Sequence, residues 1–273
     1  MIIPNKNYGI NEQTQIKSEI DKKIEDISIN GFTVLEDCFN KNEILKISKC
    51  FNDTKEQFHK MYSYSYLKSI DEHNGIRAPF LIDKTGTFIK LATNKKLLQL
   101  VSGLIKGLFY LNQQNGIINP AGNTYNQGMW HRDLPYQHFT SSSPLGINAL
   151  YCVDDFTVEN GSTFVLPGTH KVTKFPSNMF VKENAKHITA KAGSYIVLDC
   201  MIFHSGGTNK SLNDRRAVNH VFTIPHIKKQ IDYYFHEIPS IVPEKVKGIF
   251  DSNDNVSHNI SEYLKIRHKK KNS

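Results

Sequence analysis

Three residues suited to holding a metal ion are the most informative feature of the sequence. His131 and Asp133 form a His-x-Asp pair directly after Trp130, and His204 follows the apolar run Tyr195–Leu198. The pair offers one nitrogen and one oxygen ligand from one strand end, and a distant histidine can complete a three-ligand face that leaves the opposite side of the metal open. This is the two-histidine, one-carboxylate arrangement of non-haem Fe(II) oxygenases.

The surroundings of these residues strengthen the motif. With 12 histidines in the chain, on the order of one His-x-Asp triplet is expected by chance, so the triplet alone is weak. His131 follows a loop that contains Gly122 and Gly128, and His204 precedes the turn Ser205–Gly207. Both histidines are therefore predicted to lie at strand ends, where they could converge.

Two consecutive arginines follow the distal histidine. A buried guanidinium can hold the far end of a dicarboxylate through a bidentate, charge-assisted pair. Side chains alternate between the two faces of a strand, so one of Arg215 and Arg216 points inward and the other outward. Alternation alone leaves open which of the two faces the interior.

Several ordered sequence blocks resemble the phytanoyl-CoA dioxygenase family. The resemblance runs from about Gly31 to Ile224 and is specific because the blocks match in order with compatible spacing. The matching blocks are Trp130–Asp133, Asp154–Gly161, Leu166–His170, Ala192–Asp199, His204–Asn209 and Arg215–Ala217.

The resemblance implies a double-stranded β-helix, a cupin-like jelly roll, that uses Fe(II), 2-oxoglutarate and O2. On the family pattern, His131, Asp133 and His204 fall on the iron ligands, and Arg215 falls on the arginine that grips the C5 carboxylate of 2-oxoglutarate. Gln114 matches a glutamine that contacts the cosubstrate in some relatives.

The chain also departs from the family pattern. Relatives often carry a serine two residues after the distal histidine, where this chain has Gly206, with Ser205 as its neighbour. A tryptophan of some members is Leu150 here. Related halogenases replace the metal-binding carboxylate with a small residue, so the presence of Asp133 favours hydroxylation.

The elements that must position these residues are predicted to be helices followed by strands. A strand is expected at 31–35, and residues 62–90 are expected to form an irregular connection. From residue 109 onward short strands dominate, which indicates a mainly β fold with flanking helices, a sandwich or jelly roll. The expected helices are 12–29, one capped by Asn40 or Asn42, and 94–108, and the expected later strands are 109–118, 146–153, 162–166, 194–199 and 216–224.

Length and composition favour one domain over residues 1–273, with a helical part at 12–108, a catalytic β core at about 109–226 and a basic tail at 265–273. The formal charge is +8, of which the tail carries five positive charges. We expect a solvated tail and no nucleic-acid partner. The four cysteines show no disulfide or zinc pattern, and no apolar run is long enough to cross a membrane, so we expect no membrane partner and a cytoplasmic protein. The oligomeric state cannot be deduced.

These observations predict an iron- and 2-oxoglutarate-dependent dioxygenase that hydroxylates an unactivated C–H bond of a small or medium-sized biosynthetic metabolite, with release of succinate and CO2. Two alternatives stay open: a desaturase or epimerase of the same family, and a non-catalytic barrel that only binds a ligand. Arg132, Tyr136 and Gln137 flank the metal motif and are candidate substrate contacts, because residues beside catalytic ligands often line the pocket.

Overall fold

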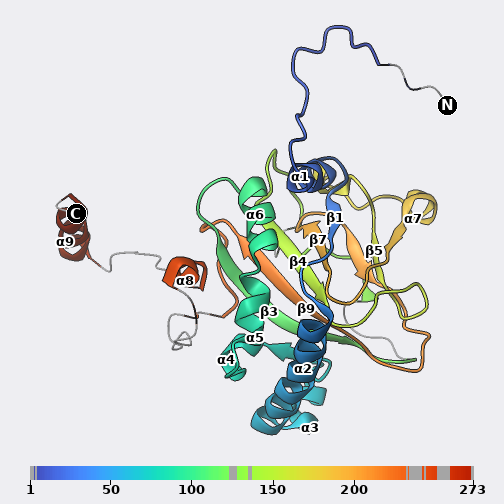
Figure 1. Cartoon of the computed structure of the whole chain (residues 1–273), viewed down its shortest axis with the longest axis vertical. Coiled ribbons are helices and arrows are strands. Elements are labelled where there is room, and N and C mark those ends of the chain that lie inside the picture. The colour runs from blue at the N-terminus through green and yellow to red at the C-terminus, as the bar shows by residue number, and fades with distance from the viewer. Residues whose placement is uncertain are drawn as a thin grey trace.

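Two antiparallel sheets form the centre of the molecule (Figure 1). The computed structural model describes residues 3, 5–122, 128–134, 137–231, 233, 242, 244–250 and 259–271. The larger sheet has the order β1 (Phe32–Leu35), β7 (Tyr195–Asp199), β4 (Gly146–Cys152), β9 (Arg215–Thr223), β3 (Tyr110–Asn119) and β2 (Gly75–Arg77). The smaller has the order β6 (Lys186–Ile188), β5 (Thr163–Val165) and β8 (His204–Gly206).

The helices lie mostly before the central strands in the chain. In the described residues they are α1 (Glu19–Asn30), α2 (Lys41–Tyr62), α3 (Tyr64–Ser69), α4 (Pro79–Ile82), α5 (Thr87–Ala92), α6 (Lys95–Leu104), α7 (Asn178–Asn184), α8 (Glu244–Phe250) and α9 (Ile260–Lys271), with a 3₁₀ turn at Thr169–Lys171. The mainly β architecture with flanking helices, expected from the sequence, is confirmed.

Local sequence explains where the long helices begin. Asn40 caps α2, because its side-chain oxygen accepts from the Glu43 backbone and the Glu43 carboxylate accepts from the Asn40 backbone. This selects Asn40 over Asn42. The first helix is shorter than the predicted 12–29, since Ser18 caps it and residues 12–17 are not helical. It ends at Gly31, whose φ of 83° suits glycine.

The larger sheet presents different faces to the helices and to the smaller sheet. On one face, Tyr151, Tyr195 and Phe222 pack in a core that includes Phe88 of α5 and Leu97 of α6. The Tyr195 hydroxyl donates to the Leu91 carbonyl at 2.7 Å, which ties α5 to β7. The alternate residues of the strands face the other way. Those residues include Ile117, Leu150, Leu198 and Ala217, which form a second apolar cluster with Val165 and Ile188 of the smaller sheet.

The predicted strands match β1, β3, β4, β5, β7 and β9 to within about two residues at each end. The irregular connection predicted at 62–90 is wrong in detail, because it contains α3, β2, α4 and most of α5. Among the described residues, no helix is both long and apolar enough to span a membrane.

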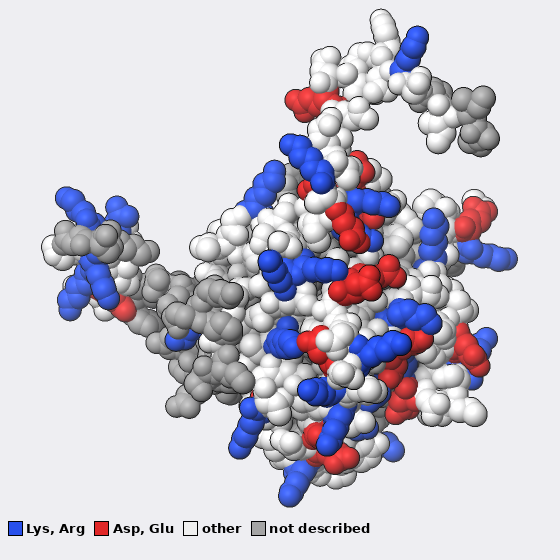
Figure 2. All heavy atoms as spheres, in the orientation of Figure 1, with Lys and Arg blue, Asp and Glu red and all other residues white. Residues whose placement is uncertain are grey.

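The basic tail takes part in α9, so the solvated chain end that we expected is helical up to Lys271. Figure 2 shows blue side chains gathered on this helix, whereas both signs of charge intermix over the visible face of the body. Tyr263 and Leu264 of α9 are more than half exposed, so the helix packs little of its apolar surface in this chain.

Candidate metal centre

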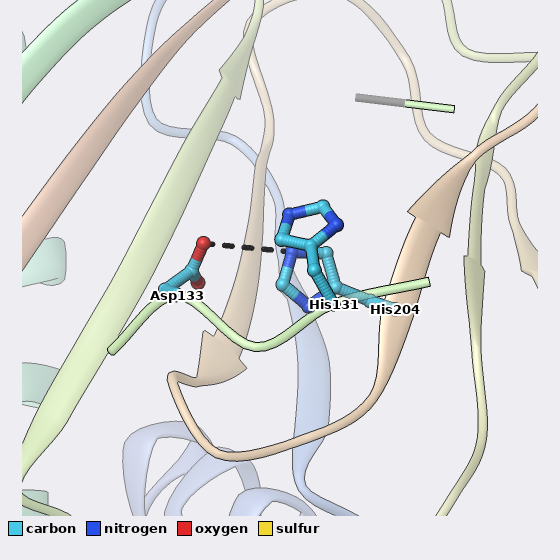
Figure 3. A group of neighbouring side chains, drawn as sticks. All are labelled: His131, Asp133 and His204. Atoms are coloured by element: carbon cyan, nitrogen blue, oxygen red, sulfur yellow. Dashed lines mark ion pairs between the residues drawn. The ribbon is translucent and has the colours of Figure 1, made fainter. Parts of the chain in front are cut away.

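The structure brings His131, Asp133 and His204 together (Figure 3). One ligand atom from each lies within 4.8 Å of the others. His204 Nε2 is 3.6 Å from Asp133 Oδ1, and the two imidazole centroids are 4.3 Å apart. His204 is buried, and the side chain of Asp133 is only 11% exposed. The cluster is therefore largely sheltered from water.

Backbone hydrogen bonds hold the two histidines side by side. The His131 amide donates to the His204 carbonyl at 3.0 Å, and the His204 amide donates back at 3.1 Å. Two residues further along, the Asp133 amide donates to the Cys200 carbonyl at 3.0 Å. The segment that carries the His-x-Asp pair is thus fastened to β8 and to the turn before it.

Each imidazole has its Nδ1 atom committed to the backbone. His131 Nδ1 lies 2.7 Å from the Met129 carbonyl oxygen, and His204 Nδ1 lies 3.1 Å from that of Ile202. A carbonyl can only accept, so each Nδ1 carries the proton and each Nε2 keeps its lone pair in the neutral ring. Burial lowers the pKa of His204, against the opposing effect of Asp133, which favours that neutral form. The Nε2 atom of each ring is therefore able to bind a metal ion.

Asn148 of β4 orients the carboxylate. Its Nδ2 donates to Asp133 Oδ2 at 3.0 Å, which leaves Oδ1 on the side of His204. Asn148 is 5% exposed, so this hydrogen bond to a charged group is made away from bulk water. No sequence signal indicates a role for Asn148, because an asparagine inside an apolar strand belongs to no motif. An outer partner of this kind is typical of metal ligands.

The alternation of β9 separates the two arginines. Arg215 is 2% exposed, stacks over the Phe156 ring with 3.9 Å from Cζ to the centroid, and lines the same cavity as the metal cluster. Arg216 faces α2, where it pairs with both Asp154 oxygens and bonds to Ser48. The inward residue is therefore Arg215.

The cavity beside the cluster combines polar and apolar walls. Its other lining residues are Ile117, Asn148, Leu150, Thr163, Leu198, Gly206, Ala217 and Asn219. Gly206 faces this cavity and brings no hydroxyl. The hydroxyl of Ser205 instead donates to the Gly128 carbonyl at 3.0 Å. Thr163, which is paired with Gly206 across β5 and β8, lines the same cavity and carries a hydroxyl group.

The expected contact between Gln114 and a cosubstrate is not supported by the structure. Gln114 is fully buried on the helix-facing side of β3, where its Nε2 donates to the Phe88 carbonyl of α5 at 2.8 Å. The neighbours that face the metal side are Gln113 and Asn115. A register irregularity between Leu111 and Gln113 determines which β3 side chains face the metal side. The spacing of residues in the sequence could not reveal it.

The three candidate substrate contacts have different outcomes. The Arg132 guanidinium is buried, stacks over Phe203 at 3.9 Å and donates to the carbonyls of Gln137, Thr169 and Val172, so it fastens the segment after β5. Gln137 Nε2 donates to the Arg132 carbonyl at 3.4 Å. These hydrogen bonds of Arg132 and Gln137 go to the protein's own backbone, and Arg132 also lines a hollow beside the metal cluster. Tyr136 lies outside the described residues.

Comparison with known proteins gives consistent results. A model of the family described as "Phytanoyl-CoA dioxygenase (PhyH)" matches residues 28–217. The chain is 30% identical over 185 residues to the uncharacterized protein Rv1501 of Mycobacterium tuberculosis, covering 65% of this chain and 66% of that one, so it spans just under two thirds of that relative's length. It is 29% identical over 110 residues to the iron/alpha-ketoglutarate-dependent dioxygenase ausO of Aspergillus calidoustus, covering 38% of this chain and 37% of that one.

Solved structures share the fold at low sequence identity. EctD from S. alaskensis, solved with 2-oxoglutarate and 5-hydroxyectoine, has a TM-score of 0.60 and 16% identity, covering 82% of this chain and 81% of that one. AviO1 from Streptomyces viridochromogenes has a TM-score of 0.60 and 16% identity, covering 78% and 98%. These similarities confirm the cupin-type fold class predicted from the sequence.

Proposed function

Since the chain belongs to the phytanoyl-CoA dioxygenase family of iron- and 2-oxoglutarate-dependent dioxygenases, we propose that it hydroxylates an unactivated C–H bond of a small or medium-sized metabolite. Iron and 2-oxoglutarate, when bound, supply the O2 chemistry. One oxygen atom of O2 enters succinate, which forms from the cosubstrate with loss of CO2, and the other enters the product as a hydroxyl group. The protein contributes ligands, orientation and shelter from water.

The observation that carries this proposal is the arrangement of two imidazoles and one carboxylate. The donor atoms lie within 4.8 Å of one another, and both Nδ1 atoms are bonded to backbone carbonyls. Neutral imidazoles and a carboxylate suit Fe(II), and three ligands on one side leave positions for a cosubstrate and O2. His131, Asp133 and His204 would hold the iron, and Asn148 would keep the Asp133 carboxylate oriented.

The cavity next to this cluster suits a small dicarboxylate. Arg215 lies buried at its wall and would pair with the carboxylate far from the metal, as its position in the family pattern implies. The Thr163 hydroxyl would donate a hydrogen bond to the same carboxylate. Leu150 and Leu198 complete the wall and exclude water, which strengthens the attraction between the guanidinium and the carboxylate.

Anaerobic spectroscopy tests the proposal before any substrate is known. Addition of Fe(II) and then 2-oxoglutarate to the wild-type protein should produce a visible charge-transfer band. The band should be absent in His131→Ala and retained in the control His226→Ala, because His226 is exposed and lies outside the cluster. A wild-type protein that shows no band and forms no succinate from 2-oxoglutarate in air would refute the proposal.

The mass of the product separates hydroxylation from its rivals. Hydroxylation adds one oxygen atom to the substrate, and desaturation removes two hydrogen atoms. Retention of the Asp133 carboxylate in the cluster supports hydroxylation over halogenation. A product that lacks the added oxygen would redirect the assignment to desaturation or epimerisation without changing the role of the metal centre.

A further inference from the structure

A groove of about 220 Å³ opens beside the metal centre, next to the cavity that contains Arg215. His131 and Asp133 line both hollows, so a molecule in the groove would meet the metal cluster from a second side. The described residues that line the groove come from the segment around β2, from the metal-facing side of β3 and from β9; those of the first segment are Asp71, Glu72, Asn74, Gly75 and Arg77, and those of β9 are Asn219 and Val221.

Three neutral amide side chains form a connected row along one wall of the groove. Asn219 Oδ1 accepts from the Asn115 backbone amide at 3.1 Å, and Asn115 Nδ2 donates to Gln113 Oε1 at 3.2 Å. These bonds fix which end of each amide is used internally. The row keeps an NH₂ donor on Asn219, a carbonyl acceptor on Asn115 and an NH₂ donor on Gln113 for a ligand.

Charge in the groove is almost balanced. Arg77 forms a two-point ion pair with Glu72, at 2.7 Å from Nε and 2.6 Å from NH2, so the two side chains neutralise each other. The Arg132 guanidinium is occupied by backbone carbonyls. Among the described lining residues no lysine is present, and the exposed Asp71 forms no ion pair with another described residue. The wall therefore offers no ready cation to a phosphate or a carboxylate.

We propose that this groove binds the substrate and that the substrate presents an uncharged, polyhydroxylated ring, such as a glycosyl or cyclitol unit, to the metal centre. This inference rests on the proposed function, since it treats the groove as the place where the C–H bond is held. A hydroxyl group both donates and accepts, so neighbouring hydroxyls on one ring match a donor, acceptor, donor row.

The size and chemistry of the groove disfavour other ligand classes. Its volume lies below the roughly 300–1,000 Å³ of drug-sized sites, which suits one ring and not a long chain. An acyl chain would leave the buried Asn115 amide and its neighbours without water or partners, and unpaired buried polar groups are costly. A phosphorylated ligand would bring charge to a wall of neutral amides.

Saturation-transfer NMR on the metal-free full chain tests the inference without relying on turnover. The probes are methyl glycosides of the common hexoses and myo-inositol, compared with glucose 6-phosphate and octanoate. We expect transfer to at least one neutral polyol and to neither anion. Gln113→Leu and Asn219→Leu should each weaken that binding at least tenfold, whereas Gln99→Leu, a matched change at an exposed site on α6, should not.

A further substitution at Gln113 shows whether a loss of binding results from misfolding. Gln113→Glu keeps the oxygen that accepts from Asn115 but replaces the ligand-facing donor with a charged acceptor, so it should also weaken polyol binding while the circular dichroism spectrum stays that of wild type. Preference for octanoate or the phosphorylated sugar, or no transfer to any neutral polyol, would overturn the substrate class.

The charge-transfer band is then recorded after Fe(II) and 2-oxoglutarate are added to the same preparation. It distinguishes a wrong substrate class from a wrong proposed function. A normal band without polyol binding refutes only the substrate class. Polyol binding without a band supports the groove and refutes the dioxygenase.

Discussion

Replacing Asn148 with leucine should weaken metal binding without unfolding the protein. The substitution removes the hydrogen bond from Nδ2 to Asp133 Oδ2, made at 3.0 Å by a residue that is 5% exposed. A hydrogen bond to a charged group contributes about 1.5–3 kcal/mol. Because about 1.4 kcal/mol corresponds to a factor of ten, the affinity for Fe(II) should fall roughly 10- to 100-fold, as is usual when the partner of a metal ligand is lost.

The stability of the metal-free protein should change much less. Asn148 Oδ1 is buried and accepts no hydrogen bond from the described residues, which is unfavourable in the native protein. Leucine has a similar volume and removes that unsatisfied acceptor, while Asp133 loses its donor. The two effects oppose each other, so the metal-free unfolding midpoint should move little.

Anaerobic titration with Fe(II), followed by calorimetry, measures the affinity directly. Asn112→Leu is the matched control, because Asn112 is an equally buried asparagine that bonds to Thr223 and Ile227 away from the metal cluster. The control should lose stability and keep its metal affinity. Wild-type Fe(II) affinity in a folded Asn148→Leu protein would refute the idea that this amide orients the carboxylate.

Three other outcomes follow from the same structure. Arg215→Gln should weaken 2-oxoglutarate binding by about 3 kcal/mol, roughly a hundredfold, whereas Arg216→Gln should lower thermal stability and leave cosubstrate affinity unchanged; the reverse pattern in calorimetry would exchange their roles. Thr163→Val should raise the 2-oxoglutarate dissociation constant by roughly tenfold, since it removes one hydroxyl donor, and an unaltered constant would exclude that contact. Burial lowers the pKa of His220 from 6.5 to about 4, so its stabilising contribution is present above pH 6.5 and is lost as the pH falls toward 4. Urea unfolding should therefore show about 2 kcal/mol less stability at pH 5 than at pH 7 from this residue, and His220→Gln should remove that difference.

The sequence predicts the large elements well because their patterns are long enough to read. Asn40 and the helical spacing after it indicate α2, and strand-forming segments separated by turn signals indicate β4 and β9. Strands of three residues, such as β6 and β8, are too short for a period to be recognised. Their existence depends on pairing with β5, a tertiary contact that no local pattern encodes.

The metal cluster was predictable in identity, whereas its surroundings were not. His131, Asp133 and His204 follow from motif and family resemblance, and they meet in space. The face of β3 on which each side chain lies depends on a register irregularity between Leu111 and Gln113, so the family match of Gln114 could not show that its side chain faces the helices. Asn148 and Thr163 are ordinary residues in apolar strands, and only three-dimensional proximity gives them a place in the site.

The pairing of the two histidine backbones has a consequence for how the protein matures. His131 and His204 are separated by 73 residues in sequence (204 − 131) yet share two reciprocal peptide hydrogen bonds. A nascent chain that has not yet emerged past β8 has two of the three proposed ligands, His131 and Asp133, and lacks His204. The complete set of proposed ligands therefore exists only after β8 has been synthesised, and any product truncated before β8 would lack one imidazole of the cluster.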